Sequence, residues 1–166
     1  MRDVEFDRFY GETAAPLHAY LARVGGSDAL ADDLVQTAYV RFLTVREPPR
    51  HPKARRVYLF RIARNLLRDE LRRRGREVDA EGVPEPAAER PAMECESRIE
   101  VRRAFDTLSR RDRELLWLAY VAGLAHREIA AVADVAEGSV RVLLHRARVR
   151  FSELLEGRGL GPEDLA

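Results

Sequence analysis

Arginine side chains recur at helical spacing along residues 56–76, where they share a segment with an apolar stripe. The arginines are Arg61, Arg64, Arg68 and Arg72. Each guanidinium carries several N–H donors whose geometry matches phosphate oxygens. Residues 46–76 contain 12 basic and 3 acidic side chains, whereas the whole chain has a net charge of only +1. Such a block is typical of a surface that binds a nucleic-acid backbone, and the alternative is a well-solvated arginine-rich helix.

Residues that would catalyse a reaction or hold a metal do not gather in this sequence. It contains no HExxH motif and no glycine-rich phosphate loop, its four histidines are scattered, and Cys95 is its only cysteine. We therefore predict no enzyme activity, no metal site and no cofactor. The sequence also lacks an 18-residue apolar run and a signal-peptide pattern, which predicts a cytoplasmic protein.

The pattern of apolar residues predicts an all-α protein. Helices are expected over residues 3–24, 27–47 and 56–76, and Pro16 divides or bends the first of them. Ser27 is a suitable N-cap for the second helix, since it follows two glycines. The buried face predicted for this second helix consists of Leu30, Leu34, Tyr39 or Val40, and Leu43.

The predicted organisation is two small helical domains, at 1–75 and 98–157, followed by a tail at 158–166. Residues 76–97 between them are rich in proline and acidic side chains and poor in large apolar ones. This composition predicts a flexible linker that is an ordinary solvated spacer. The alternative hypothesis is that its negative charge shields the basic helix from non-specific DNA.

The second domain contains a helix-turn-helix pattern. HREIAAVA is followed by the short turn DVAEG and the basic segment SVRVLLHRARVRFSELLE. The second helix of such a pair lies in the major groove of DNA. A three-helix packing unit without DNA affinity is the alternative. Inward-facing residues are predicted to be Val140, Leu144 and Ala147 or Phe151, against Ile129 and Val132, and the groove-facing candidates are Glu137, Ser139, Arg141, Val142, His145, Arg146 and Arg148.

Two segments together resemble a known family. ADDLVQTAYVRFL and YLFRIARNLLRDELRRR resemble the second region of bacterial sigma factors, and LSRRDRELLWLAYVAGLAHREIAAVADVAEGSVRVLLHRAR resembles the fourth region. Both occur in order with only a short linker between them, as in the extracytoplasmic-function sigma factors. The resemblance covers roughly residues 5–74 and 98–156. It implies a factor that binds core RNA polymerase, selects promoters and helps open the minus-10 element.

The resemblance assigns the basic helix to the minus-10 DNA. The residues implied in this contact are Arg55, Arg56, Tyr58, Arg61, Arg64, Asn65 and Arg68. Arginines would hold phosphates, and the loop before the helix would capture a base flipped from the non-template strand. Tyr58 is the candidate for stacking on that base, and a half-buried core tyrosine is the equal alternative. Asn65 either contacts a base or caps local structure.

The resemblance also implies two protein partners. The segment ADDLVQ matches the part that grips core RNA polymerase, which would involve Asp32, Asp33, Leu34, Gln36 and Phe42. The two aspartates also favour the N-terminal end of the helix dipole, and both roles are compatible. An anti-sigma factor is the second implied partner.

Some residues depart from the family pattern. Ala125 and Ala136 stand where helix-capping serine or threonine is usual, Asp134 replaces a glycine at the turn, and Leu143 replaces a groove-facing arginine. Losing a cap costs about 0.5–2 kcal/mol. The alternatives are thus a sigma-like interaction protein without promoter specificity, and a helix-turn-helix regulator that acts without polymerase.

Overall fold

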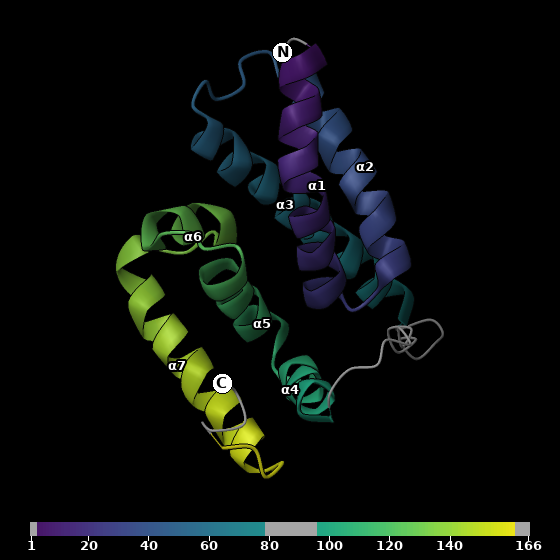
Figure 1. Cartoon of the computed structure of the whole chain (residues 1–166). Coiled ribbons are helices and arrows are strands. Elements are labelled where there is room, and N and C mark those ends of the chain that lie inside the picture. The colour runs from purple at the N-terminus through teal and green to yellow at the C-terminus, as the bar shows by residue number, and fades with distance from the viewer. Residues whose placement is uncertain (1–2, 79–95, 162–166) are drawn as a thin grey trace. The chain divides into compact units, whose positions relative to one another are not determined.

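The computed structural model describes residues 3–78 and 96–161, and these residues form helices and connecting turns without a strand (Figure 1). The chain divides into two compact units, which confirms the all-α, two-domain prediction. The first unit is built on α1 (Asp3–Gly25), α2 (Asp28–Thr44) and α3 (Pro52–Val78). The second is built on α4 (Glu96–Thr107), α5 (Arg110–Leu116), the π-helical segment η1 (Trp117–Val121), α6 (His126–Ala133) and α7 (Glu137–Glu156).

The turn between α1 and α2 forms as its sequence predicts. Helix α1 is continuous across Pro16 and ends where Gly26 adopts a φ of 77° and donates to the carbonyl of Ala22. Ser27 then caps α2, because its Oγ accepts a hydrogen bond of 3.2 Å from the N–H of Leu30. Two consecutive caps therefore fix the angle between the two helices.

The core of the first unit lies where α1, α2 and α3 pack on one another. Aromatic rings dominate one end of it. Phe9 stacks on Phe42 with ring centroids 5.1 Å apart, and Tyr39 lies edge-on to Phe9. Leu43 was predicted to be buried but is 51% exposed, because Phe42, one position earlier, takes the inward direction. The choice left open between Tyr39 and Val40 is settled in favour of Tyr39, which is buried.

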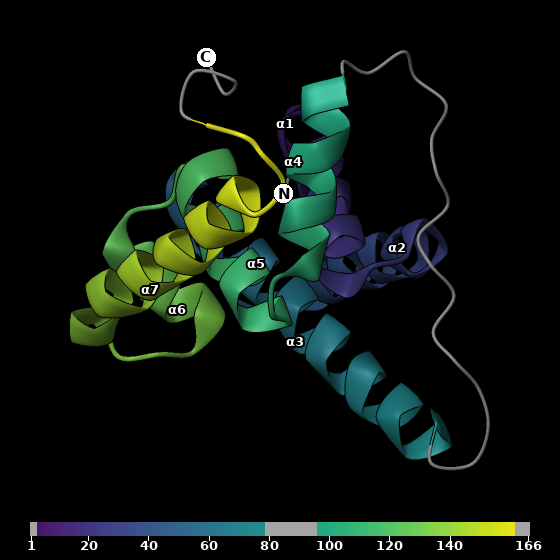
Figure 2. The same ribbon diagram turned by 90° about the horizontal axis from the view of Figure 1, so that it is seen from below.

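The second unit is held together by α7, on which α4 and α5 pack (Figure 2). Its core includes Leu108, Leu116 and Ala147, with Phe105, Phe151 and Leu154 packed around them. Ser109 caps α5 by accepting from the N–H of Asp112. The segment η1 then inserts a π-helical turn, which alters the direction of the side chains that follow. Val121, at the end of this segment, is 61% exposed.

The turn between α6 and α7 is the tight connection that a helix-turn-helix requires. Asp134 ends α6 in the left-handed conformation with φ 55° and ψ 52°. Ala125 and Ala136 occupy the N-cap positions without a side-chain acceptor, as the sequence indicates. Glu128 supplies part of a cap, because its carboxylate accepts the N–H of Ala125 at 2.8 Å. Both helices form despite their missing caps.

The predicted linker falls largely outside the described residues, as does the end of the predicted tail. Helix α3 extends to Val78 and α4 begins at Glu96, so that each reaches into the predicted linker range. None of the helices described here is both long enough and apolar enough to cross a membrane.

Candidate nucleic-acid and polymerase interfaces

Helix α3 separates an apolar face from a basic one. Leu59, Phe60, Ala63, Leu66 and Leu67 are buried in the first unit. The arginines predicted to form a stripe follow another face, where Arg61 and Arg72 are exposed and Arg64 and Arg68 are half-buried. Asn65 is half-buried beside them. The helix therefore presents guanidinium groups outward while its opposite face packs in the core.

Tyr58 lies between the core and this basic face. Its ring centroid is 6.3 Å from that of Phe42, and the guanidinium carbon of Arg61 lies 5.9 Å from its centroid. The ring is half-buried. One part of the ring packs inward, as the core alternative expects, and another meets a cation, while stacking on a flipped base stays a prediction. Tyr58 and Arg61 together form a paired aromatic and guanidinium surface.

Arg55 and Arg56, both predicted to contact DNA, are engaged by the chain itself. The guanidinium of Arg55 binds the carboxylate of Glu5 on α1 and donates through Nε to the carbonyl of Pro49 at 2.8 Å. Its side chain is only 18% exposed. Arg56 lies over the ring of Phe60, with 5.7 Å from guanidinium carbon to centroid. Arg56 and Phe60 are neighbours at i,i+4 spacing, whereas spacing along the helix gave no sign of the partners of Arg55.

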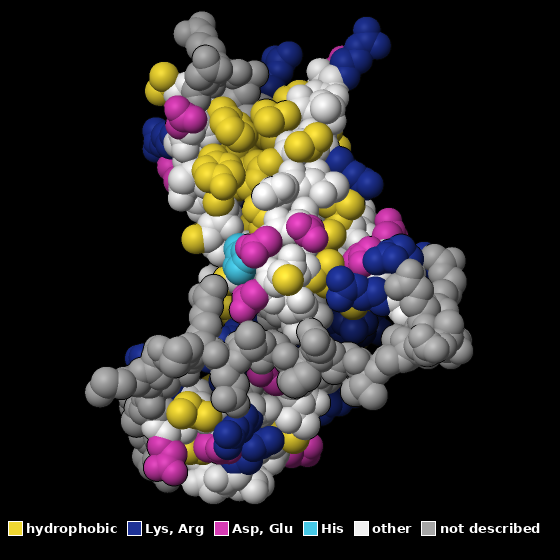
Figure 3. All heavy atoms as spheres, turned by 90° about the vertical axis from the view of Figure 1, so that its right-hand side faces the viewer, with side chains coloured by type: hydrophobic (Ala, Val, Ile, Leu, Met, Phe, Trp, Pro, Cys, Tyr) yellow, Lys and Arg dark blue, Asp and Glu magenta, His cyan; other side chains and the backbone are white. Residues whose placement is uncertain are grey.

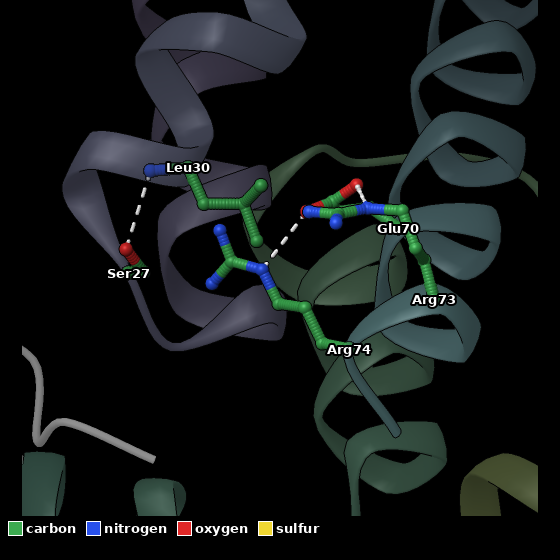
Figure 4. Close-up of polar contacts among 5 residues, drawn as sticks. All are labelled: Ser27, Leu30, Glu70, Arg73 and Arg74. Atoms are coloured by element: carbon green, nitrogen blue, oxygen red, sulfur yellow. Dashed lines mark hydrogen bonds and ion pairs between the residues drawn. The ribbon is translucent and has the colours of Figure 1, made fainter. Parts of the chain in front are cut away.

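A single carboxylate near the end of α3 holds two arginines. Glu70 accepts from Arg73 at 2.6 and 2.9 Å and from Nε of Arg74 at 2.9 Å (Figure 4). These hydrogen bonds lower the pKa of Glu70 to about 2, because they stabilise the charged carboxylate. The three consecutive arginines Arg72, Arg73 and Arg74 are all exposed, and the described contacts with Glu70 come from the last two. The three consecutive arginines are therefore not equivalent.

The residues predicted to bind polymerase divide between the surface and the core of α2. Asp33 and Gln36 are exposed, and Asp32 is exposed but lies 2.8 Å from Nε2 of His18 on α1. Leu34 is buried, and Phe42 is only 1% exposed. The prediction that Phe42 touches a partner does not fit this burial, since its ring stacks on Phe9 inside the unit.

Sequence reasoning missed an exposed apolar surface on α1 and α2. Figure 3 shows hydrophobic side chains gathered on this face of the first unit. The large exposed apolar side chains of these two helices are Val4, Tyr10, Val40 and Leu43. Val40 is 62% exposed and lies seven residues after Asp33, which is two helical turns. That spacing is the signal that places Val40 on the same face as Asp33 and Gln36.

The groove-facing residues predicted on α7 all lie on its exposed side. Glu137, Ser139, Arg141, Val142, His145, Arg146 and Arg148 are exposed, whereas Val140, Leu144 and Ala147 are buried. Ile129 and Val132 of α6 are fully buried, as the helix-turn-helix prediction requires. Farther along α7, Arg150 turns back to the buried carboxylate of Asp112 on α5, at 2.8 and 3.0 Å. Arg150 therefore belongs to the packing of the unit.

Comparison with known proteins places both units in one family. A model of sigma-70 region 2 matches residues 9–77, and a model of sigma-70 region 4 matches residues 98–151. The chain is 33% identical over 154 residues to the ECF RNA polymerase sigma factor EcfG of Rhodopseudomonas palustris, covering 89% of this chain and 85% of that relative. The chain belongs to the ECF sigma factor family. It is an RNA polymerase sigma factor.

Other relatives of this ECF sigma factor carry similar names. SigL of Mycobacterium tuberculosis is 32% identical over 150 residues, covering 83% of this chain and 81% of SigL. CarQ of Myxococcus xanthus is 31% identical over 157 residues, covering 90% and 88% of the two chains. Among solved structures, the sigma factor RpoE from Bartonella quintana, crystallised with the anti-sigma factor NepR, matches with a TM-score of 0.76 and 26% identity over 92% of this chain and 97% of RpoE.

Proposed function

We propose that this sigma factor binds core RNA polymerase through α2 and uses α3 and α7 to hold the minus-10 and minus-35 elements of a promoter. The observation that carries the proposal is the order of the two family matches, each of which coincides with a unit that exposes basic side chains on one helix. The two alternatives explain less. A stand-alone regulator leaves the exposed surface of α2 without a role, and a sigma-like protein without promoter specificity leaves the exposed side of α7 without one.

At the minus-10 element, the exposed arginines of α3 bind phosphates and so position the DNA without reading its sequence. Arg61 and Arg72 are the most accessible of the stripe. Unstacking a base costs a few kcal/mol, and a stacking surface in the protein offsets this cost. Tyr58 and Arg61 supply an aromatic ring and a guanidinium plane for that purpose. Arg64, Arg68 and Asn65 lie along the same strip of the helix.

At the minus-35 element, the N-terminal half of α7 enters the major groove. Arg141 and His145 reach base edges, and Val142 offers an apolar contact to a thymine methyl group. Arg146 and Arg148 hold the phosphates on either side. Leu143 is half-buried and adds no donor, so we propose that this element differs from the sequence most common in the family.

The polymerase-binding surface centres on Asp33, Gln36 and Val40, which share one exposed side of α2. The apolar side chains of α1 and α2 in Figure 3 extend this surface, and such patches mark protein interfaces. Asp32, which is paired with His18, also belongs to this surface. Phe42 and Leu34 act indirectly, because they support the helix from within.

An anti-sigma factor is the second proposed partner. RpoE of Bartonella quintana was crystallised with the anti-sigma factor NepR, and RpoE covers nearly all of this chain. We propose that a protein of this kind holds the sigma factor away from polymerase by covering the same exposed surfaces.

Transcription in vitro tests the proposed function. The purified chain is added to sigma-free bacterial core polymerase with fragmented genomic DNA, and the RNA 5′ ends are sequenced. New start sites that share two upstream elements are expected. Replacing Arg141 and His145 together with alanine should alter the minus-35 preference and leave core binding unchanged. Binding to core without new starts would instead favour the interaction protein, and no binding to core would contradict the role of α2.

A further inference from the structure

We propose that Arg55 is a positioning residue that, together with Glu5, fixes the loop at residues 45–51 in front of α3. The inference rests on the proposed function and on the role that the family resemblance implies for this loop, which is to capture a base flipped from the non-template strand of the minus-10 element. It changes the role expected for Arg55, which is not a phosphate contact. It also gives a role in DNA capture to Glu5, an acidic residue on a different helix.

Arg55 joins three parts of the first unit. Its Nε donates to the carbonyl of Pro49 in the loop at 2.8 Å, and its Nη1 binds the carboxylate of Glu5 on α1. Its backbone N–H donates to the carbonyl of His51 at 3.0 Å in the first turn of α3. One residue therefore connects the loop, the helix that follows it and α1.

The remainder of the loop is already restricted. Pro48 and Pro49 have fixed φ angles, and Pro52 begins α3 at the position where proline is best tolerated. His51 caps the helix, because its Nδ1 accepts the N–H of Lys53 at 3.3 Å. A loop restricted in this way needs few further contacts to hold one conformation. Arg55 supplies such a contact at Pro49, in the middle of the loop.

The surroundings of Arg55 argue against direct binding to a phosphate. Its side chain is 18% exposed, and its donors already meet a carboxylate and a carbonyl. A phosphate would have to compete with Glu5 for the same guanidinium. Arg61, in contrast, is exposed on the same helix and is the matched comparison for a direct contact.

The test measures binding of the full chain, assembled with core polymerase, to a promoter fragment recovered by the transcription experiment and carrying a mismatched, pre-opened minus-10 element. Affinity is measured over a series of salt concentrations. The variants are Glu5→Gln, Arg55→Gln, their combination and Arg61→Ala. Glu12→Gln is the control, because Glu12 is an exposed acid of α1 that pairs with Arg8 on the same helix.

Glu5→Gln and Arg55→Gln should each weaken binding by roughly tenfold, because the loop must then be ordered on binding. The combined variant should be no weaker than Arg55→Gln alone, since both remove one interaction. Neither should change the slope of log affinity against log salt. Arg61→Ala should reduce that slope by about 0.7, the value for one phosphate contact on a single strand. Glu12→Gln should match the wild type, and affinity for core should be unchanged throughout.

A direct phosphate contact would give a different pattern. Arg55→Gln would then reduce the salt slope, and Glu5→Gln would bind equally or more tightly, because an anion near the DNA is removed. That result would overturn the inference and leave the proposed function intact. Loss of core affinity in parallel with DNA affinity would also overturn it, since the pair would then only stabilise the unit. An unchanged slope for Arg61→Ala would contradict the minus-10 role of α3 and the inference with it.

Discussion

Substitutions at two residues of α2 should have very different effects on stability and on polymerase binding. Asp33 is exposed on the proposed polymerase surface, and Phe42 is enclosed by aromatic rings in the core. A polymerase-binding defect could therefore arise in two ways, by loss of a contact or by loss of the fold. Stability and affinity must be measured together to separate these causes.

Asp33→Lys should weaken core polymerase binding by at least tenfold and change the free energy of unfolding by less than about 0.5 kcal/mol, as is usual at exposed positions. Phe42→Ala should cost about 3–5 kcal/mol of stability, because it removes a buried ring. Urea unfolding and a core-binding titration of both variants check this. Equal stability losses would contradict the separation between surface and core.

The Glu70 carboxylate should give a pH-dependent contribution to stability. Its pKa in the folded protein is about 2, lower than the ordinary value of 4.5, so its contribution is complete above about pH 4.5 and is lost as the pH falls toward 2. Glu70→Gln should therefore reduce the free energy of unfolding by about 0.5–1 kcal/mol at pH 7, since the pairs are partly exposed. The difference from wild type should narrow below pH 4.5, which urea unfolding at several pH values would detect. A constant difference down to pH 3 would contradict this account.

At the scale of helices, two glycines of α1 differ in the space that surrounds them for a side chain. A Cβ added at Gly25 would lie 2.8 Å from Cδ1 of Leu67 on α3, whereas a Cβ at Gly11 meets nothing within 4 Å. Leu67 is buried in the core of the first unit. The end of α1 therefore approaches α3 closely only because residue 25 has no side chain.

Gly25→Ala should destabilise the protein by about 1–3 kcal/mol through overpacking against α3. Gly11→Ala should stabilise it by about 0.5–1 kcal/mol, because alanine is the better residue in an exposed helix interior. Thermal unfolding of the two variants side by side gives the comparison. Similar shifts of Tm in the same direction would exclude close packing as the cause.

Much of this arrangement follows from helical periodicity, and the exceptions have physical reasons. The pattern in α7 predicted Val140 and Leu144 as inward residues, because apolar and charged side chains alternate clearly there. In α2 it predicted Leu43 as buried, which was wrong, because the adjacent Phe42 is equally apolar and takes the inward direction. The π-helical turn of η1 has no clear sequence signal, so helical periodicity does not predict it. The partner of Arg55 lies 50 residues away, where only the folded structure brings it close.

For the whole molecule, the distribution of charge matters more than its total. The net charge of +1 hides a basic block at 46–76, and residues 77–106 contain nine acidic and four basic side chains. Opposite charges adjacent in the chain reduce the attraction of the free protein for DNA, and this effect is strongest at low salt. We therefore expect the acidic segment to favour promoter binding over non-specific binding.

Replacing Glu81, Glu85, Glu89 and Glu94 with glutamine should strengthen binding of the free chain to random duplex DNA by about threefold to tenfold at low salt. The change removes four negative charges from the segment that follows the basic block. Fluorescence anisotropy with a random duplex measures the effect, and the difference should vanish at about 0.5 M salt because the charges are then screened. Equal affinities at low salt would mean that the segment is only a spacer.

The length of α3 should make its amide hydrogens exchange at different rates along the helix. Its 27 residues extend about 40 Å, and the residues from Arg72 to Gly75 are all exposed. This exposed turn is held by backbone hydrogen bonds and by the pairs that Arg73 and Arg74 make with Glu70. Its amide hydrogens should exchange with water far sooner than those between Leu59 and Leu67, because local opening there need not disturb the bundle. The most densely charged turns of the helix are thus also the ones that open most often.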